Sequence, residues 1–184
     1  MSTQGEPRWL SAEQQRAWRA YLRGSRLIEE ALDRDLQSHG VQLTEYEIIS
    51  MISEAPGRRL RMSTLADLVV QSRSRLTHTA SRLEKRGWVR RESCLEDKRG
   101  VELVLTPAGW EAVREMAVVH VDSVRKNVID PVPAELFLSL CQAMDHIRAA
   151  LAPDNDGPHP GSGGRAFAIT QVIVSTDASG PAWD

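Results

Sequence analysis

Cationic side chains crowd one stretch of the chain, between residues 58 and 99. Twelve arginines and lysines lie there beside five acids, so the stretch carries +7 while the remaining residues carry −9. This imbalance favours a polyanion as the partner, and arginine suits bidentate contacts with guanine or phosphate. The stretch is therefore a candidate surface for binding a nucleic-acid duplex, although a biased genome composition would also raise the arginine count.

Residues 72–86 predict a helix with one apolar and one polar side, capped by one of the serines at its start. Three apolar residues share the side that we expect to be buried, namely Leu76, Ala80 and Leu83. The opposite side presents Ser74, His78, Ser81, Arg82 and Lys85, with Arg75 on its flank. Donors near the start of such a helix can meet base edges in the major groove, whereas an ordinary solvated face would have the same composition.

A hairpin is predicted directly after this helix. Gly87 and Trp88 indicate a left-handed glycine cap, and strands 88–94 and 100–105 flank a charged turn. The tip of that turn carries Asp97, Lys98 and Arg99. A cation there can reach a phosphate or the narrow minor groove, and Asp97 can orient Arg99 through a charge-assisted hydrogen bond.

Helices are predicted on both sides of this module. The first spans residues 11–38, and at 1.5 Å per residue its length of about 40 Å exceeds what one small core needs, as in helices that pack on a partner chain. The other predicted elements are a helix opened by Thr44 with Glu47, an extended link over 58–62, a helix from Ser63 or Thr64 to Val70, and helices over 107–128 and 133–151.

Three motifs accompany these elements, and together they resemble the MarR family of bacterial transcription regulators. They are S-R-L-T-x-x-x-x-R-L-E-x-R-G-W-V-x-R from Ser74, D-x-R-G from Asp97 and L-T-P-A-G from Leu105. The resemblance covers about residues 11–151 and is most specific from Leu65 to Gly109.

The resemblance implies a winged helix on an α-helical homodimer, with both chain ends building the dimer interface. It also implies binding to a pseudo-palindromic double-stranded operator, usually as a repressor and often with release by a small ligand. By this resemblance Asp97 and Arg99 match the wing motif. The major-groove candidates that it implies are Arg73, Ser74, Arg75, Thr77 and His78.

The expected fold is mainly α with a small β-wing. We assign 1–43 and 107–151 to a helical dimerisation region and 44–106 to a winged helix-turn-helix DNA-binding region. Residues 152–184 are rich in proline and glycine at their start and read as a flexible tail, for which the resemblance offers no role.

Two ideas about regulation remain open. An aromatic or anionic effector could bind in a crevice beside the dimer helices, with Trp18 and Tyr46 as walls and Arg23 and Arg26 as cations, although core and solvated positions would explain the same residues. Cys94 lies near Arg90 and Arg91, which could lower the pKa of its thiol and make the protein redox-responsive. The family's peroxide sensors carry a cysteine near the start of the first helix, and this chain has none there.

Other classes of protein are disfavoured. The five histidines show no metal-binding spacing, and we found no phosphate loop or nucleophile motif, so we expect no enzyme, no metal and no cofactor. No apolar run is long enough to span a bilayer, and the N-terminus lacks a signal-peptide core, so a cytoplasmic protein is expected. A winged helix used for protein contacts is the main alternative, but it does not need so many cations.

Overall fold

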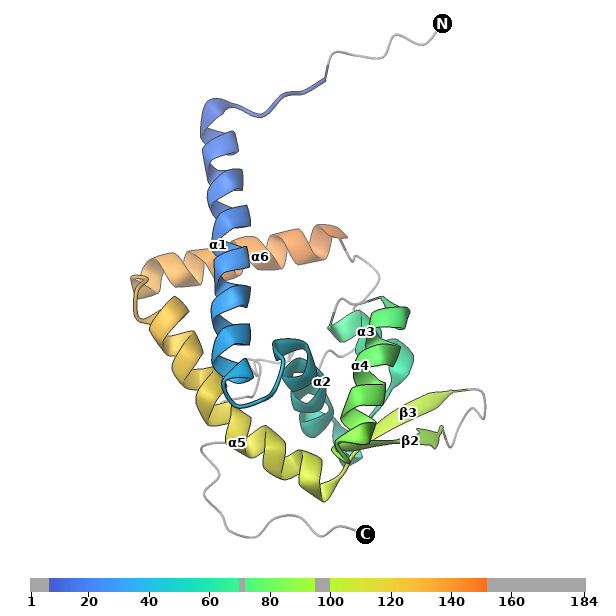
Figure 1. Cartoon of the computed structure of the whole chain (residues 1–184). Helices are drawn as coiled ribbons and strands as arrows, with labels where there is room; N and C mark the ends of the chain where they lie inside the picture. The colour runs from blue at the N-terminus through green and yellow to red at the C-terminus, as the bar shows by residue number, and fades with distance from the viewer. Residues whose placement is uncertain (1–6, 70–71, 95–99, 152–184) are drawn as a thin grey trace, which may run out of the picture.

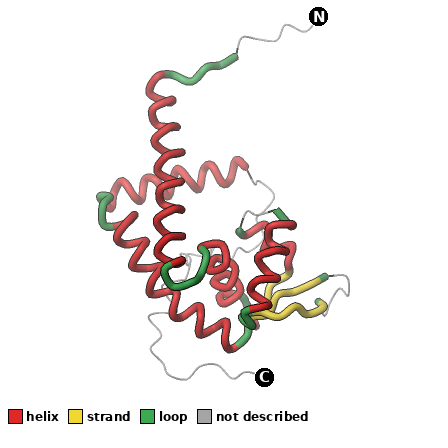
Figure 2. The backbone as a smooth tube through the Cα atoms, viewed as in Figure 1, coloured by secondary structure: helices red, strands yellow, loops and turns green. Residues whose placement is uncertain are grey.

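Most of the chain forms helices around one small sheet (Figures 1 and 2). The computed structural model describes residues 7–69, 72–94 and 100–151. Its elements are α1 (Ala12–Gln37), α2 (Leu43–Glu54), η1 (Pro56–Arg58), β1 (Arg59–Arg61), α3 (Met62–Leu68), α4 (Arg73–Lys85), β2 (Val89–Ser93), β3 (Val101–Leu105), α5 (Pro107–Val124), η2 (Arg125–Ile129) and α6 (Ala134–Leu151). The expected fold class, mainly helical with a β-wing, is confirmed.

Helices α2, α3 and α4 pack beside the sheet and form the winged helix, from which β2 and β3 project as the wing (Figure 1). The strands are antiparallel in the order β1-β3-β2, with Val89 opposite Leu105 and Ser93 opposite Val101. One apolar core joins these helices to the sheet and to the start of α5. Its fully buried members include Ile48, Ile49, Ile52, Leu65, Leu83 and Leu103.

The extended link expected over residues 58–62 is a strand for three of its residues. Arg59–Arg61 pairs with β3, so that Leu60 lies opposite Leu103. The edge of β3 that faces away from β2 would otherwise leave backbone groups unpaired, and the link satisfies them. The wing therefore has three strands rather than two.

The second helix begins two residues earlier than expected, because a different pair of residues caps it. Gln42 and Glu45 form the capping box, whereas Thr44 and Glu47 were predicted to do so. Glutamine can take the place of serine or threonine here because its side-chain oxygen also accepts from a backbone amide. The expected first box, Ser11 with Gln14, is confirmed.

Helices α1, α5 and α6 form the second part of the molecule. The N-terminal half of α1 stands clear of the winged helix, and α6 crosses α1 (Figure 1). The predicted fifth helix, 107–128, divides into α5 and a π-helical turn, in which Asn127 Nδ2 donates to the Ser123 carbonyl over 2.9 Å. None of the 18 residues of α6 is buried.

A second apolar cluster joins the two parts. It packs α1 and the turn after it against α2 and α5, through Leu36, Val41, Leu43, Tyr46 and Met116. The Ser123 hydroxyl donates to the Asp35 carboxylate over 2.6 Å, which ties α5 to α1 beside this cluster. Within the described ranges, no helix is both long enough and apolar enough to cross a bilayer.

Candidate nucleic-acid interface

Helix α4 presents the polar surface that its sequence predicts. The Ser72 side chain accepts from the Arg75 amide over 3.3 Å and caps the helix. Leu76, Ala80 and Leu83 are buried, as expected, and Thr79 is buried with them. The residues left exposed on the first two turns are Arg73, Ser74, Arg75, Thr77 and His78.

A glycine turn connects α4 to the wing. Gly87 has a φ of +71°, a conformation in which a residue with a Cβ is strained. The Trp88 amide donates to the Leu83 carbonyl over 3.0 Å and closes the helix end. The chain therefore passes from the last turn of α4 into β2 with no intervening loop, which fixes the wing close to the helix.

Arg91 on β2 holds the wing against α4. Its guanidinium lies 2.9 Å from Glu84 and 3.1 Å from the Ser81 hydroxyl, and it also donates to the Thr77 carbonyl over 3.3 Å. The sequence gave no reason to assign this role, since Arg91 had been considered only as a neighbour of Cys94. Helix and wing thus form one unit.

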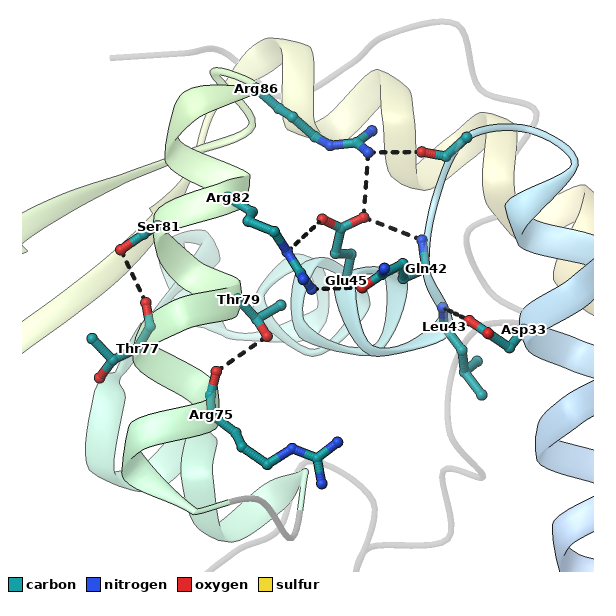
Figure 3. A network of polar contacts seen from close by, with 11 residues as sticks. Asp33, Gln42, Leu43, Glu45, Arg75, Thr77, Thr79, Ser81, Arg82 and Arg86 are labelled. Atoms are coloured by element: carbon teal, nitrogen blue, oxygen red, sulfur yellow. Dashed lines mark hydrogen bonds and ion pairs between the residues drawn. The ribbon is translucent and has the colours of Figure 1, made fainter.

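Many of the clustered cations pair with acids inside the module. Arg59 lies 2.9 Å from Glu92 across the sheet, and Arg90 lies 2.6 Å from the same carboxylate. The hydrogen bond from Arg90, together with Arg59, lowers the pKa of Glu92. Arg82 and Arg86 both reach the buried Glu45 (Figure 3). The charge of +7 counted along the sequence is therefore partly neutralised within the fold.

The remaining cations are concentrated on α4. In the part of the chain that the structure describes, Arg73, Arg75 and Lys85 have no ion-pair partner, and all three are exposed. Two of them lie on the first turn, beside Ser74, Thr77 and His78. This N-terminal face of α4 can offer several hydrogen-bond donors and uncompensated positive charge to one partner.

Asp97, Lys98 and Arg99, the predicted wing-tip residues, lie outside the described residues. Cys94, just before them, is only 4% exposed, so its thiol is enclosed by the fold. Cys141, on α6, is exposed.

The four residues considered for an effector do not converge within one chain. Trp18 is half exposed and stacks on Tyr21 with ring centroids 5.6 Å apart, and Arg23 and Arg26 are exposed on the same helix. Tyr46 is buried near Leu36, about 27 Å further along α1 at 1.5 Å per residue. Its ring packs on His120 with centroids 4.8 Å apart.

Burial shifts the pKa values of this pair in opposite directions. It raises the pKa of Tyr46 above its usual value and lowers the pKa of His120, because each is disfavoured in its charged form. Both groups are therefore neutral near pH 7. The Tyr46 hydroxyl and His120 Nδ1 are buried and have no hydrogen-bond partner among the described residues.

These features define a winged helix-turn-helix protein with a cationic recognition helix and a separate, partly unpacked set of helices. A family model described as MarR family matches residues 39–100. In a structural comparison, the chain is similar to Sco3205, a MarR family transcriptional regulator from Streptomyces coelicolor whose crystal structure is in complex with DNA. The identity is 44%, the TM-score is 0.76, and the match covers 82% of this chain and 94% of that one.

Two characterised relatives agree with this comparison. The transcriptional regulator PecS of Dickeya dadantii is 28% identical over 131 residues, which is 70% of this chain and 74% of PecS. The transcriptional repressor MprA of Escherichia coli is 30% identical over 92 residues, which is 50% of this chain and 52% of MprA. The chain belongs to the MarR family of transcriptional regulators.

Proposed function

We propose that the protein is a sequence-specific regulator that binds double-stranded DNA and represses transcription from a pseudo-palindromic operator. The observation that carries this proposal is the N-terminal face of α4, where Arg73 and Arg75 are exposed and unpaired beside three hydroxyl or imidazole side chains. Cations that the fold leaves without partners are available to phosphate or guanine, whereas cations paired with buried acids are not. Sco3205, 44% identical, crystallised with DNA.

The residues of α4 divide into two roles in this proposal. Arg75, on the first turn, is placed to read a base edge in the major groove, with Ser74, Thr77 and His78 beside it. Arg73 and Lys85, at the two ends of the helix, flank the groove and bind phosphates. The wing-tip residues Asp97, Lys98 and Arg99 complete the contact in the neighbouring minor groove.

We propose that the protein acts as a homodimer in the cytoplasm. Leu136, Leu140 and Ile147 lie on one side of α6 at helical spacing and are 44–62% exposed. An amphipathic helix of this length is marginal in water without a surface to pack on. A second copy, packed through α6 and the free half of α1, covers this apolar side and presents two α4 helices to half-sites about 34–36 Å apart.

Selection of bound sequences from a random duplex library tests the proposal. We expect an inverted repeat with half-sites about one helical turn apart. Arg75→Ala should cost about 1–3 kcal/mol and relax the preference at particular base pairs, whereas Lys85→Ala should weaken binding to all sequences alike. A wild-type protein that binds no duplex at low salt would instead support a winged helix used for protein contacts.

We also propose release by a small aromatic or anionic effector. Trp18, Arg23 and Arg26 place an aromatic surface and two cations on the free half of α1, which supports a site completed by the partner chain rather than by Tyr46 of the same chain. Benzoate is a suitable probe. It should quench tryptophan fluorescence in the wild type but less in Trp18→Phe, and equal quenching in both would argue against Trp18.

A further inference from the structure

A single buried carboxylate connects the recognition helix to the helix that precedes the helix-turn-helix. Glu45, on the first turn of α2, is only 2% exposed, and α4 supplies an arginine to each of its oxygens (Figure 3). Arg82 Nε lies 3.2 Å from Oε1, and Arg86 Nη2 lies 3.5 Å from Oε2. A carboxylate buried to this degree depends on its partners, because removal of one leaves a charge that is poorly solvated.

The same two arginines reach beyond Glu45 into the turn between α1 and α2. Arg82 Nη2 donates to Gln42 Oε1 over 2.7 Å, and Arg86 Nη2 donates to the Gly40 carbonyl over 2.7 Å. The backbone after this turn is held in its place by α1, since the Leu43 amide donates to Asp33 Oδ1 over 2.8 Å. Contacts therefore run without a gap from α1, through the turn, to the C-terminal half of α4.

We infer that Glu45 sets the position of α4, and that Arg82 is a positioning residue acting through Glu45 rather than a DNA contact. This inference rests on the proposed function, since it concerns how the DNA-reading face is held. The guanidinium of Arg82 is already occupied by two acceptors on α2, whereas Arg75 on the same helix keeps its guanidinium free. In a dimer the clamp also fixes the separation of the two recognition helices, because its other end is anchored on α1.

The test compares Glu45→Gln, Arg82→Ala and the double variant in the full chain. Glutamine at position 45 keeps the capping bond to the Gln42 amide and nearly the same shape, but it removes the charge that holds the arginines. Glu111→Gln, an exposed acid on α5, is the matched control for the loss of one negative charge. Affinity for the selected duplex is measured against salt concentration.

The two hypotheses predict opposite signs for Glu45→Gln. If only charge mattered, loss of an acid beside the interface would tighten binding, and the control shows how much. Positioning through Glu45 predicts binding weakened by about tenfold, within the range seen for residues in one ion-pair network. Arg82→Ala should weaken binding to a similar extent with an unchanged salt slope, and the double variant should be no weaker than the worse single variant.

Binding of Glu45→Gln that equals or exceeds that of the control overturns the inference. So does a salt slope that Arg82→Ala makes shallower by about 0.9, because that change marks a lost phosphate contact. Hydrogen exchange without DNA provides the independent measurement, in which Glu45→Gln should speed exchange in the last two turns of α4. If the wild type bound no duplex, the proposed function would fail, and unchanged exchange in Glu45→Gln would separately sink the clamp.

Discussion

Gly109, on the first turn of α5, should not tolerate even one added methyl group. A Cβ built there would meet the Trp88 carbonyl oxygen well inside contact distance and would lie 2.8 Å from Leu105 Cδ1. The Trp88 carbonyl cannot move freely, because it accepts from the Thr106 amide over 3.0 Å and from the Thr106 hydroxyl over 3.1 Å. Gly109→Ala must therefore separate α5 from the base of the wing.

The contributions to the cost can be added. Overpacking of this kind costs about 1–3 kcal/mol, and each hydrogen bond to Trp88 that is lost costs about 1 kcal/mol more. The better helix propensity of alanine returns up to about 1 kcal/mol. The net loss is about 3 kcal/mol, which lowers the midpoint of thermal unfolding by roughly 6–12 °C for a chain of this size.

Thermal unfolding followed by circular dichroism measures this loss. Protein concentration is kept constant, because the stability of a dimer depends on it. Glu111→Ala, two residues further along the same helix and exposed, serves as the control and should change stability by no more than about 0.5 kcal/mol. A Gly109→Ala protein as stable as the wild type would show that α5 does not approach the Trp88 carbonyl so closely.

Two further predictions concern the helices behind the winged helix. Burial lowers the pKa of His120, so the unfolded chain takes up a proton at higher pH than the folded chain; the stability present above about pH 6.5 should be lost as pH falls further, and His120→Phe should reduce that loss in denaturant titrations between pH 7 and 5. Leu140→Glu puts a charge on the apolar side of α6 and should shift sedimentation toward the monomer, whereas the exposed Ser139→Glu on another side of the helix should not.

The sequence predicted the elements whose signals are local. The caps at Ser11, Ser72 and Thr106 and the glycine turn at Gly87 each depend on a few neighbouring residues, and all four occur as expected. Strand β1 was missed because three residues carry no periodic signal, and its formation depends on a partner strand 43 residues away in the chain.

The polar surface of α4 was predicted only in part, for a similar reason. Helical spacing assigns Arg82 to the same exposed face as His78, and it cannot indicate that Glu45, on another helix, accepts that arginine. Charge counting likewise adds all cations together, while tertiary contacts decide which of them remain free. The L-T-P-A-G motif was recognised as a pattern, and the structure adds its physical reason at Gly109.

This distinction between paired and free cations leads to a numerical prediction about salt. If all twelve cations of residues 58–99 met phosphates, a dimer would give a slope of log affinity against log salt of about −22, at 0.9 per contact. The three unpaired cations of α4 give about −5 for a dimer, and adding Lys98 and Arg99 gives about −9. We expect a measured slope between these two values. A slope steeper than about −12 would mean that arginines such as Arg59 and Arg90 leave Glu92 for the DNA, and the internal pairs would then be a store of positive charge rather than part of the framework.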